Sequence, residues 1–206
     1  MRILQDELLI RRAQRGDADA FEQLLLEHQK NVYNLCYRMA GNPDDAMDLS
    51  QETFLRAWRC LDQYQFASAF STWLYRLCSN ICIDFLRRRR RQQTVPLTFE
   101  DADGEEQTYA VPDAQPLPEE QVELKLTRET LAAAMAQLLP EHRAVLQLRV
   151  VNEMSYEQIA DVLDIQIGTV KSRLSRARNQ LKKILERGNL SRRASSESME
   201  GEVAAK

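Results

Sequence analysis

The segment 155–183, SYEQIADVLDIQIGTVKSRLSRARNQLKK, constrains the fold most because its pattern is that of two short helices joined by a turn. Ser155 and Gln158 fit a capping box, in which each side chain bonds the backbone N–H group of the other residue and so starts a helix. Ala160 is small enough to let a second helix cross the first closely. A turn at residues 164–167 completes the pattern of a helix-turn-helix.

The second of these helices, expected to begin near Gly168, has one apolar and one basic polar face. At 3.6 residues per turn its apolar stripe consists of Val170, Leu174, Ala177 and Leu181. The opposite face carries Ser172, Ser175, Arg176 and Asn179, flanked by Lys171, Arg173 and Arg178. The major groove admits one helix and is read by Arg and short polar side chains. An ordinary amphipathic hairpin would leave such a face solvated, but the order of cap, crossing residue and polar residues favours DNA binding.

The composition is typical of a helical protein. The 206 residues include only 6 Gly and 6 Pro, and 7% are aromatic. No apolar run approaches the roughly 20 residues that a membrane span requires. The first residues, MRILQDELLIRR, lack the apolar core and cleavage site of a signal peptide. We therefore expect a cytoplasmic protein.

Charge is segregated along the chain although the net charge is only −3. Residues 95–123 contain many Asp and Glu but no Lys or Arg, and 95–118 have no helical periodicity. The sequence thus predicts an all-α fold of two small helical domains, 1–94 and 119–187, joined by a flexible acidic linker at 95–118. The second domain contains the helix-turn-helix. The tail, 188–206, is expected to be disordered.

Local signals place the other helix ends. Gly16 and Gly41 are expected to stop helices, and Asp17 to cap the start of a long helix. Asn42-Pro43 opens a third helix that runs to about Cys60. A loop follows at 62–71, and then a fourth helix begins at Thr72. In the second domain, helices are expected from about Glu119 to Leu138 and from Pro140 to near Asn152.

The fourth helix, in FSTWLYRLCSNICIDFLRRRRR, combines aromatic and cationic residues. Its outward positions are predicted to be Arg76, Ser79, Asn80, Ile83 and Arg87. The neighbouring aromatics are Tyr64, Phe66, Phe70 and Trp73. Aromatic rings beside cations form a platform for unstacked bases, where each stacked base contributes about 1–3 kcal/mol. The alternative is that these rings belong to the core, and for Trp73 the two interpretations stand level.

The cysteines allow two interpretations. Cys78 and Cys82 are four residues apart on a helix and could share a metal ion, but no His or further Cys is near them in sequence. Buried reduced thiols are the favoured interpretation, so no metal or cofactor is expected.

Four segments together resemble the bacterial sigma factors of the extracytoplasmic-function (ECF) group. They are DDAMDLSQETFLRAW, FSTWLYRLCSNICIDFLRRRRR, LPEHRAVLQLR and the helix-turn-helix. The resemblance implies a detachable specificity subunit of RNA polymerase without catalysis of its own. Its first domain would bind the core polymerase and read the minus-ten promoter element as melted single strand. Its second would read the minus-thirty-five element as duplex.

The resemblance also assigns site residues. Those implied for core polymerase binding are Asp45, Asp48, Gln51, Glu52 and Phe54, although acids early in a helix also favour its dipole. Those implied for the minus-ten element are Arg76, Asn80, Arg87 and Arg88, beside the four aromatic residues. Those implied for the minus-thirty-five element are Lys171, Ser172, Arg173, Ser175, Arg176 and Arg178. Gln65-Phe66 and the small Ser175 depart from many relatives, so the bases preferred can differ.

By helical position, Ser172 and Arg176 are expected at base edges, and Arg173 and Arg178 at phosphates. The family implies an anti-sigma factor as a further partner, and no small-molecule substrate. A free-standing helix-turn-helix regulator is the main alternative, usually a symmetric dimer on paired half-sites. An enzyme acting on nucleic acid is disfavoured, because no metal-binding carboxylate cluster, nucleophile–base pair or phosphate-binding glycine loop is apparent.

Overall fold

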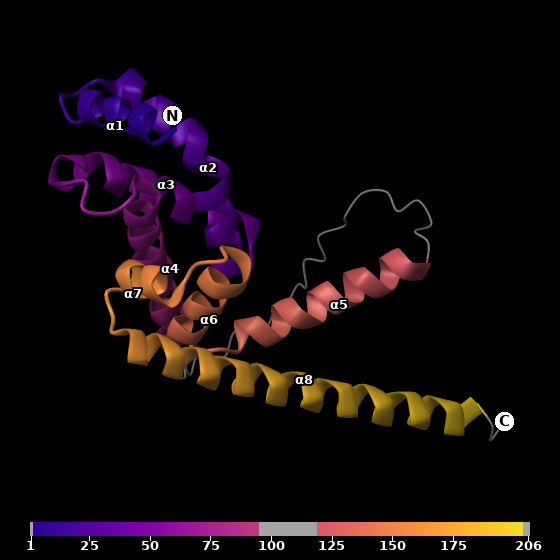
Figure 1. Ribbon diagram of the computed structural model, residues 1–206. Helices are drawn as coiled ribbons and strands as arrows, with labels where there is room; N and C mark the ends of the chain where they lie inside the picture. Colours follow the sequence, from indigo (N-terminus) through magenta and orange to yellow (C-terminus); the bar gives the residue numbers. More distant parts are fainter. Residues whose placement is uncertain (1, 95–118, 204–206) are drawn as a thin grey trace.

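The computed structural model describes residues 2–94 and 119–203, which form helices and turns without a β-strand among them (Figure 1). The predicted all-α fold is confirmed for these residues, and the linker predicted at 95–118 lies outside them. None of the helices described is long and apolar enough to cross a bilayer. In chain order the elements are α1 (Arg2–Ala13), α2 (Ala18–Ala40), α3 (Pro43–Arg59), η1 (Leu61–Gln63), α4 (Phe70–Thr94), α5 (Glu119–Ala136), α6 (Pro140–Leu146), η2 (Gln147–Val151), α7 (Tyr156–Leu163) and α8 (Ile167–Val203).

Helices α1 to α4 form a first unit whose ends follow the local sequence signals. The Asp17 carboxylate accepts a hydrogen bond from the backbone N–H of Ala20 at 3.0 Å and caps α2. Gly41 ends α2 with a φ of 81°, a left-handed conformation that costs glycine nothing. The Asn42 side chain accepts the backbone N–H of Asp44 at 2.8 Å and caps α3. These predicted helix ends are confirmed.

The core of the first unit lies between α2, α3 and α4. Its fully buried side chains include Leu24 and Val32 of α2, Ala46 and Ala57 of α3, and Leu74 of α4. The alanines of α3 let it approach its neighbours closely. This packing fixes which residues of α3 and α4 remain available to partners.

The second unit contains the predicted helix-turn-helix. Ser155 donates its backbone N–H to Gln158 Oε1 at 2.8 Å, and the Gln158 N–H donates to Ser155 Oγ at 3.2 Å, so the capping box is confirmed. Helix α7 ends at Asp164, whose φ of 52° reverses the chain before α8. Ala160 is 9% exposed at the helix crossing, and the stripe residues Val170, Leu174 and Ala177 are buried.

Three boundaries differ from the sequence prediction. Helix α4 begins at Phe70 rather than Thr72. Helix α6 is followed by a π-helical turn, η2, where Asn152 donates its N–H to the Gln147 carbonyl at 3.2 Å. Helix α8 continues to Val203, beyond residue 187, where the second domain was predicted to end, and the disorder predicted for the tail 188–206 stays a prediction. Residues 188–203 contain no proline, so a helix already started by buried residues adds one hydrogen bond per further residue.

The two units pack against each other, with α6 and α7 lying against α4, whereas α5 and α8 extend away (Figure 1). Their buried apolar residues form one continuous cluster. The Arg143 side chain of α6 is 5% exposed and donates its Nε–H to the Arg38 carbonyl of α2 at 3.0 Å. This packing corrects the expected exposure of Ser79 and Ile83, which are 1% and 7% exposed. Helices α2, α3, α6 and α7 all pack on α4, so between Phe70 and Phe85 only Asn80 and Asp84 are exposed, whereas residues 87–92 are all exposed.

Candidate nucleic-acid and polymerase interface

Helix α3 carries the five residues predicted for polymerase binding. Asp48, Gln51 and Glu52 are exposed, and Phe54 is partly buried. Asp45 forms an ion pair with Arg89 of α4 at 2.9 Å, so this carboxylate also ties the two helices together. The exposed part of α3 thus presents carboxylate and amide groups to a partner.

An apolar groove of about 690 Å³ lies beside this face, between α2 and α3. Gln51 and Phe54 line it together with residues that sequence reasoning missed. Three of them are large apolar side chains open to solvent: Met47 at 51%, Leu55 at 52% and Trp58 at 38% exposure. The missed signal is helical spacing, because positions 47, 51, 54, 55 and 58 recur at i, i+4, i+7, i+8 and i+11 on one face of α3. We name this surface, Met47, Gln51, Phe54, Leu55 and Trp58, the α3 groove.

The four aromatic residues predicted for base stacking form one cluster with two kinds of members. Tyr64 and Phe70 are 6% and 5% exposed, and the Tyr64 hydroxyl donates to the Ser68 carbonyl at 2.6 Å. Phe66 and Trp73 are partly exposed and pack on Tyr64, with ring centroids 4.9 and 5.4 Å from it. Phe66 has a φ of 59°, which is rare for a bulky residue. Tyr64 and Phe70 thus form a buried support for Phe66 and Trp73. Within this cluster only Phe66 and Trp73 reach the surface.

The predicted DNA-contacting residues of α4 differ in their exposure to solvent. Asn80 and Arg88 are exposed, whereas Arg76 is partly buried. Arg87 donates from Nε to Glu141 of α6 at 2.8 Å, a contact between the two units that the sequence did not indicate. Asn80 and Arg87 also line a cavity of about 380 Å³, together with Arg173 of α8. One residue predicted for the minus-thirty-five element therefore shares a cavity with two predicted for the minus-ten element.

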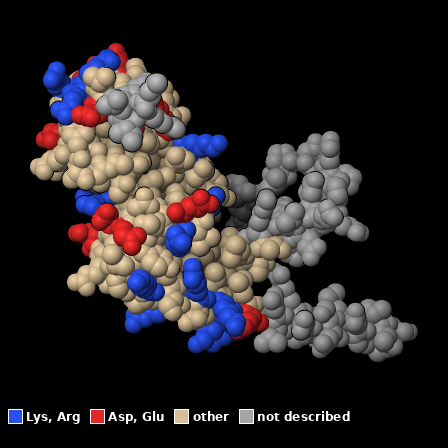
Figure 2. Space-filling view, viewed as in Figure 1, with Lys and Arg blue, Asp and Glu red and all other residues tan. Residues whose placement is uncertain are grey.

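The outer face of α8 carries the other residues predicted for the minus-thirty-five element. Lys171, Ser172, Ser175, Arg176 and Arg178 are all exposed. Ser172 donates its hydroxyl to the Thr169 carbonyl at 3.0 Å, which orients the side chain at the start of the helix. In Figure 2 basic side chains gather along the lower edge of the molecule, where Figure 1 places α8. The arrangement presents a basic, short-side-chain surface that fits a DNA groove.

Two ionisable groups of α6, Glu141 and Arg143, have shifted pKa values at the contact between the units. Burial would raise the pKa of Glu141, but its own backbone N–H and the Arg87 guanidinium outweigh burial and hold the pKa below its ordinary value of 4.5. Burial lowers the pKa of Arg143 from its ordinary value. Glu141 is therefore a carboxylate at neutral pH and can pair with the Arg87 guanidinium.

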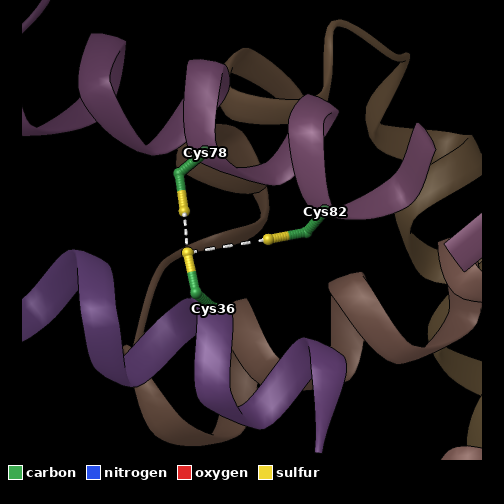
Figure 3. A group of neighbouring side chains, drawn as sticks. All are labelled: Cys36, Cys78 and Cys82. Carbon is green, nitrogen blue, oxygen red and sulfur yellow. Dashed lines mark hydrogen bonds between the residues drawn. The ribbon is translucent and has the colours of Figure 1, made fainter. Parts of the chain in front are cut away.

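Two groups of described residues have metal-ligating side chains close together. Asp6, Glu27 and His28 lie at the junction of α1 and α2 but are only partly buried or exposed. Cys36 of α2 joins Cys78 and Cys82 of α4 in the core (Figure 3). The sequence missed Cys36 because it is 42 residues from Cys78 along the chain. All four cysteines are free, and Cys36, Cys78 and Cys82 are buried while Cys60 is partly exposed.

Comparisons with known families agree with the two units. Residues 24–92 match the profile of Sigma-70 region 2, and residues 128–181 match that of Sigma-70, region 4. These ranges contain the α3 groove and all but the last two residues of α4 in the first unit, and most of the helix-turn-helix in the second.

Relatives and solved structures extend the similarity along most of the chain. The ECF RNA polymerase sigma factor SigW of Bacillus subtilis is 33% identical over 176 residues, which are 85% of this chain and 94% of SigW. The RNA polymerase sigma-H factor of Pseudomonas aeruginosa is 37% identical over 183 residues, covering 88% of this chain and 94% of its own. The structure of CnrH in complex with the cytosolic domain of CnrY covers 88% of this chain and 97% of its own, with a TM-score of 0.62 and 26% identity. The sigma factor RpoE of Bartonella quintana, in complex with the anti-sigma factor NepR, covers 81% of this chain and 96% of its own, with a TM-score of 0.56 and 27% identity. The chain therefore belongs to the ECF group of RNA polymerase sigma factors in the sigma-70 family.

Proposed function

We propose that α3 docks this chain on core RNA polymerase, that α4 and the aromatic cluster hold the melted minus-ten element, and that α8 reads the minus-thirty-five duplex. The observation that carries this proposal is the exposed basic and short-side-chain face of α8, on a chain that also presents the α3 groove. The polymerase supplies the chemistry, and the chain supplies promoter selection in the cytoplasm.

The α3 groove supports docking on a protein rather than on DNA. Met47, Leu55 and Trp58 offer apolar area, while Asp48 and Glu52 border it with negative charge. Negative charge would repel a phosphate backbone but would steer a basic protein surface into register. The buried centre of such a contact contributes most of its binding free energy.

Promoter binding requires the two units to separate. Asn80 and Arg173 line one cavity, whereas the centres of the minus-ten and minus-thirty-five elements are 25 base pairs apart, or roughly 85 Å of duplex. One cavity cannot contact both. We propose that the conformation described is a closed state, and that binding to polymerase or promoter breaks contacts such as Arg87–Glu141.

Capture of an unstacked base fits the division within the aromatic cluster. Phe66 and Trp73 present ring surface at the edge of a buried support, and Asn80 offers an amide to a base edge. Unstacking a base from duplex requires a few kcal/mol, which stacking on exposed rings offsets. Asn80→Ala is expected to change preference within the minus-ten element and to leave polymerase binding unchanged.

Transcription with purified components tests the function. Core polymerase from a bacterium, this chain and a library of promoter fragments are combined, and transcript start sites are mapped. We expect initiation from a defined subset of fragments only when the chain is added. Absence of promoter-specific transcripts with an active core enzyme would refute the proposal. A free-standing regulator would instead bind its duplex tightly without polymerase and sediment as a dimer.

Leu55→Ala tests the docking surface separately. Loss of a large apolar contact should weaken core binding by about 1–2 kcal/mol, or roughly five- to thirtyfold, measured by fluorescence anisotropy with labelled chain. Leu26→Ala is the matched control, because Leu26 is 56% exposed on α2 and does not line the groove. Equal losses in the two variants would contradict docking at the α3 groove.

An anti-sigma factor is the further partner we propose. Two similar structures, CnrH and RpoE, are recorded with CnrY and with the anti-sigma factor NepR, respectively. An inhibitor that covers the α3 groove would exclude the polymerase by competition. Leu55→Ala should then weaken the binding of both partners, the core polymerase and the anti-sigma factor.

A further inference from the structure

Three cysteine sulfurs meet in the core where α2 faces α4 (Figure 3). The Sγ atom of Cys36 lies 3.4 Å from that of Cys78 and 3.8 Å from that of Cys82. All three sulfurs lie within 4.8 Å of one another, and each residue is 0% exposed. Cys36 projects from α2 between the two thiols of α4.

These separations fit three bonds to one ion. With metal–sulfur bonds of about 2.3 Å, as in zinc thiolates, an ion at the centre of a triangle needs sulfurs roughly 4.0 Å apart. The two measured distances, 3.4 and 3.8 Å, require only small shifts of the side chains to reach that spacing. The helices supply the triangle without a change of fold, because Cys78 and Cys82 are one turn apart on α4.

The ligand set selects the kind of ion. No fourth His, Cys, Asp or Glu joins the three thiols among the described residues. Structural zinc sites are almost always closed by four ligands, whereas thiolate sulfur favours soft ions such as Cu(I). Because all three thiols are 0% exposed, bulk solvent does not reach them, which favours an ion that accepts three ligands.

A cation beside the cluster balances its negative charge. Three thiolates and one monovalent ion carry a net charge of −2, which is costly in an apolar core unless it is paired. Arg143 is buried near Cys82, close enough for the charges of the two groups to interact. Its guanidinium comes from α6 of the second unit and donates to the Arg38 carbonyl of α2 in the closed state.

We propose that Cys36, Cys78 and Cys82 form a binding site for one soft, thiophilic metal ion, with Cu(I) as its representative. Binding replaces three thiol protons, which pass to solvent, with three metal–sulfur bonds, and no electron is transferred. The bound ion would join α2 to α4 and stabilise the first unit, which presents both the α3 groove and the aromatic cluster. The proposal is independent of which promoters the chain reads.

Copper titration under anaerobic, reducing conditions tests the site. The full-length reduced chain is incubated to equilibrium with Cu(I) in competition with a chromophoric chelator. We expect one ion per chain, with the ultraviolet absorption of a copper–thiolate bond. Cys36→Ala and Cys78→Ala should each weaken binding by at least about a hundredfold, since each removes a ligand.

Cys60→Ser is the matched control, because Cys60 is a partly exposed thiol that does not belong to the cluster. It should keep the affinity of the parent chain, and circular dichroism should show that each alanine variant keeps its helical content. A melting temperature that rises with Cu(I) in the parent and Cys60→Ser chains, but not in the alanine variants, supports the site. Unchanged copper affinity in Cys36→Ala would overturn it. So would the absence of copper–thiolate absorption in the parent chain.

Discussion

Arg176 and Arg178 are both exposed on α8 but lie on different sides of it, because two residues span about 200° of a helix. Arg176 is one turn from Ser172, on the face expected to enter the groove. Arg178 flanks that face, where phosphates would lie. The two arginines are therefore expected to fail in different ways when removed.

Arg176→Ala should weaken binding to the preferred upstream element by about 1–3 kcal/mol and relax selectivity at one base pair. Arg178→Ala should weaken binding by about the same factor for every sequence. It should also reduce the number of counterions released on binding by about one. Both are measured by anisotropy of the polymerase holoenzyme on a set of single-substitution duplexes. Uniform loss in Arg176→Ala would show that this residue contacts only phosphate.

Prediction of single residues succeeded where exposure follows from helical phase. Lys171, Ser172 and Arg176 are exposed as expected. Prediction from the sequence failed where the neighbours of a residue come from distant parts of the chain. Glu141, the partner of Arg87, is 54 residues away, and no local pattern encodes that distance. The burial of Ser79 has the same origin, since several helices pack on α4.

At the scale of elements, the capping box of α7 holds the first helix of the helix-turn-helix in place. Ser155→Ala removes the acceptor of the Gln158 N–H, so the folded state should lose about 0.5–2 kcal/mol. Urea unfolding followed by circular dichroism measures the change. Because α7 packs on α4, the loss should also appear as weaker contact between the units.

Ser175→Ala is the control for this variant. Ser175 is exposed in the middle of α8 and alanine has the higher helix propensity, so its stability should stay the same or rise slightly. Equal destabilisation by the two substitutions would mean that the capping box contributes little.

Helix ends were predictable because caps act within four residues. Asp17, Asn42 and Ser155 each bond backbone groups of the turn that follows them. The π-turn η2 was not predictable, since the segment QLRVV has an ordinary helical composition. Within η2, Leu148 is fully buried and Val150 is 63% exposed, and such a turn depends on tertiary packing rather than on local sequence.

For the whole molecule, the Arg87–Glu141 pair makes the closed state depend on pH. The pKa of Glu141 is depressed below 4.5 in the folded chain, so its stabilisation is complete above that value and is lost as pH falls below it. An exposed pair contributes up to about 1 kcal/mol, or roughly a fivefold shift between closed and open forms. The radius of gyration from small-angle X-ray scattering should therefore increase on acidification.

Glu141→Gln should shift the chain toward the open form already at neutral pH and reduce its response to acid. Glu129→Gln, on the exposed face of α5, removes the same charge outside the contact and should respond like the parent chain. Identical scattering of the two variants across the pH range would show that the pair does not hold the units together.

Two domains were predictable from charge segregation and helical patterning, but their mutual packing was not. The continuous apolar cluster pairs α4 with α6 and α7, elements separated by the linker. Such pairings bring together residues far apart in sequence, such as Leu163 of α7 and Leu77 of α4, which line the same cavity. Sequence periodicity reports which face of a helix is buried, not which helix covers it.

The burial of Arg143 affects how fast the two units separate. Its guanidinium occupies the carboxyl end of α2, where the Arg38 carbonyl has no partner further along that helix. For the two units to separate, the guanidinium must leave the Arg38 carbonyl before water can hydrate either group. This step raises the activation barrier to separation. Molecules that are already apart when polymerase is added would then give a rapid burst of transcripts, followed by a slower phase set by the release of this one side chain.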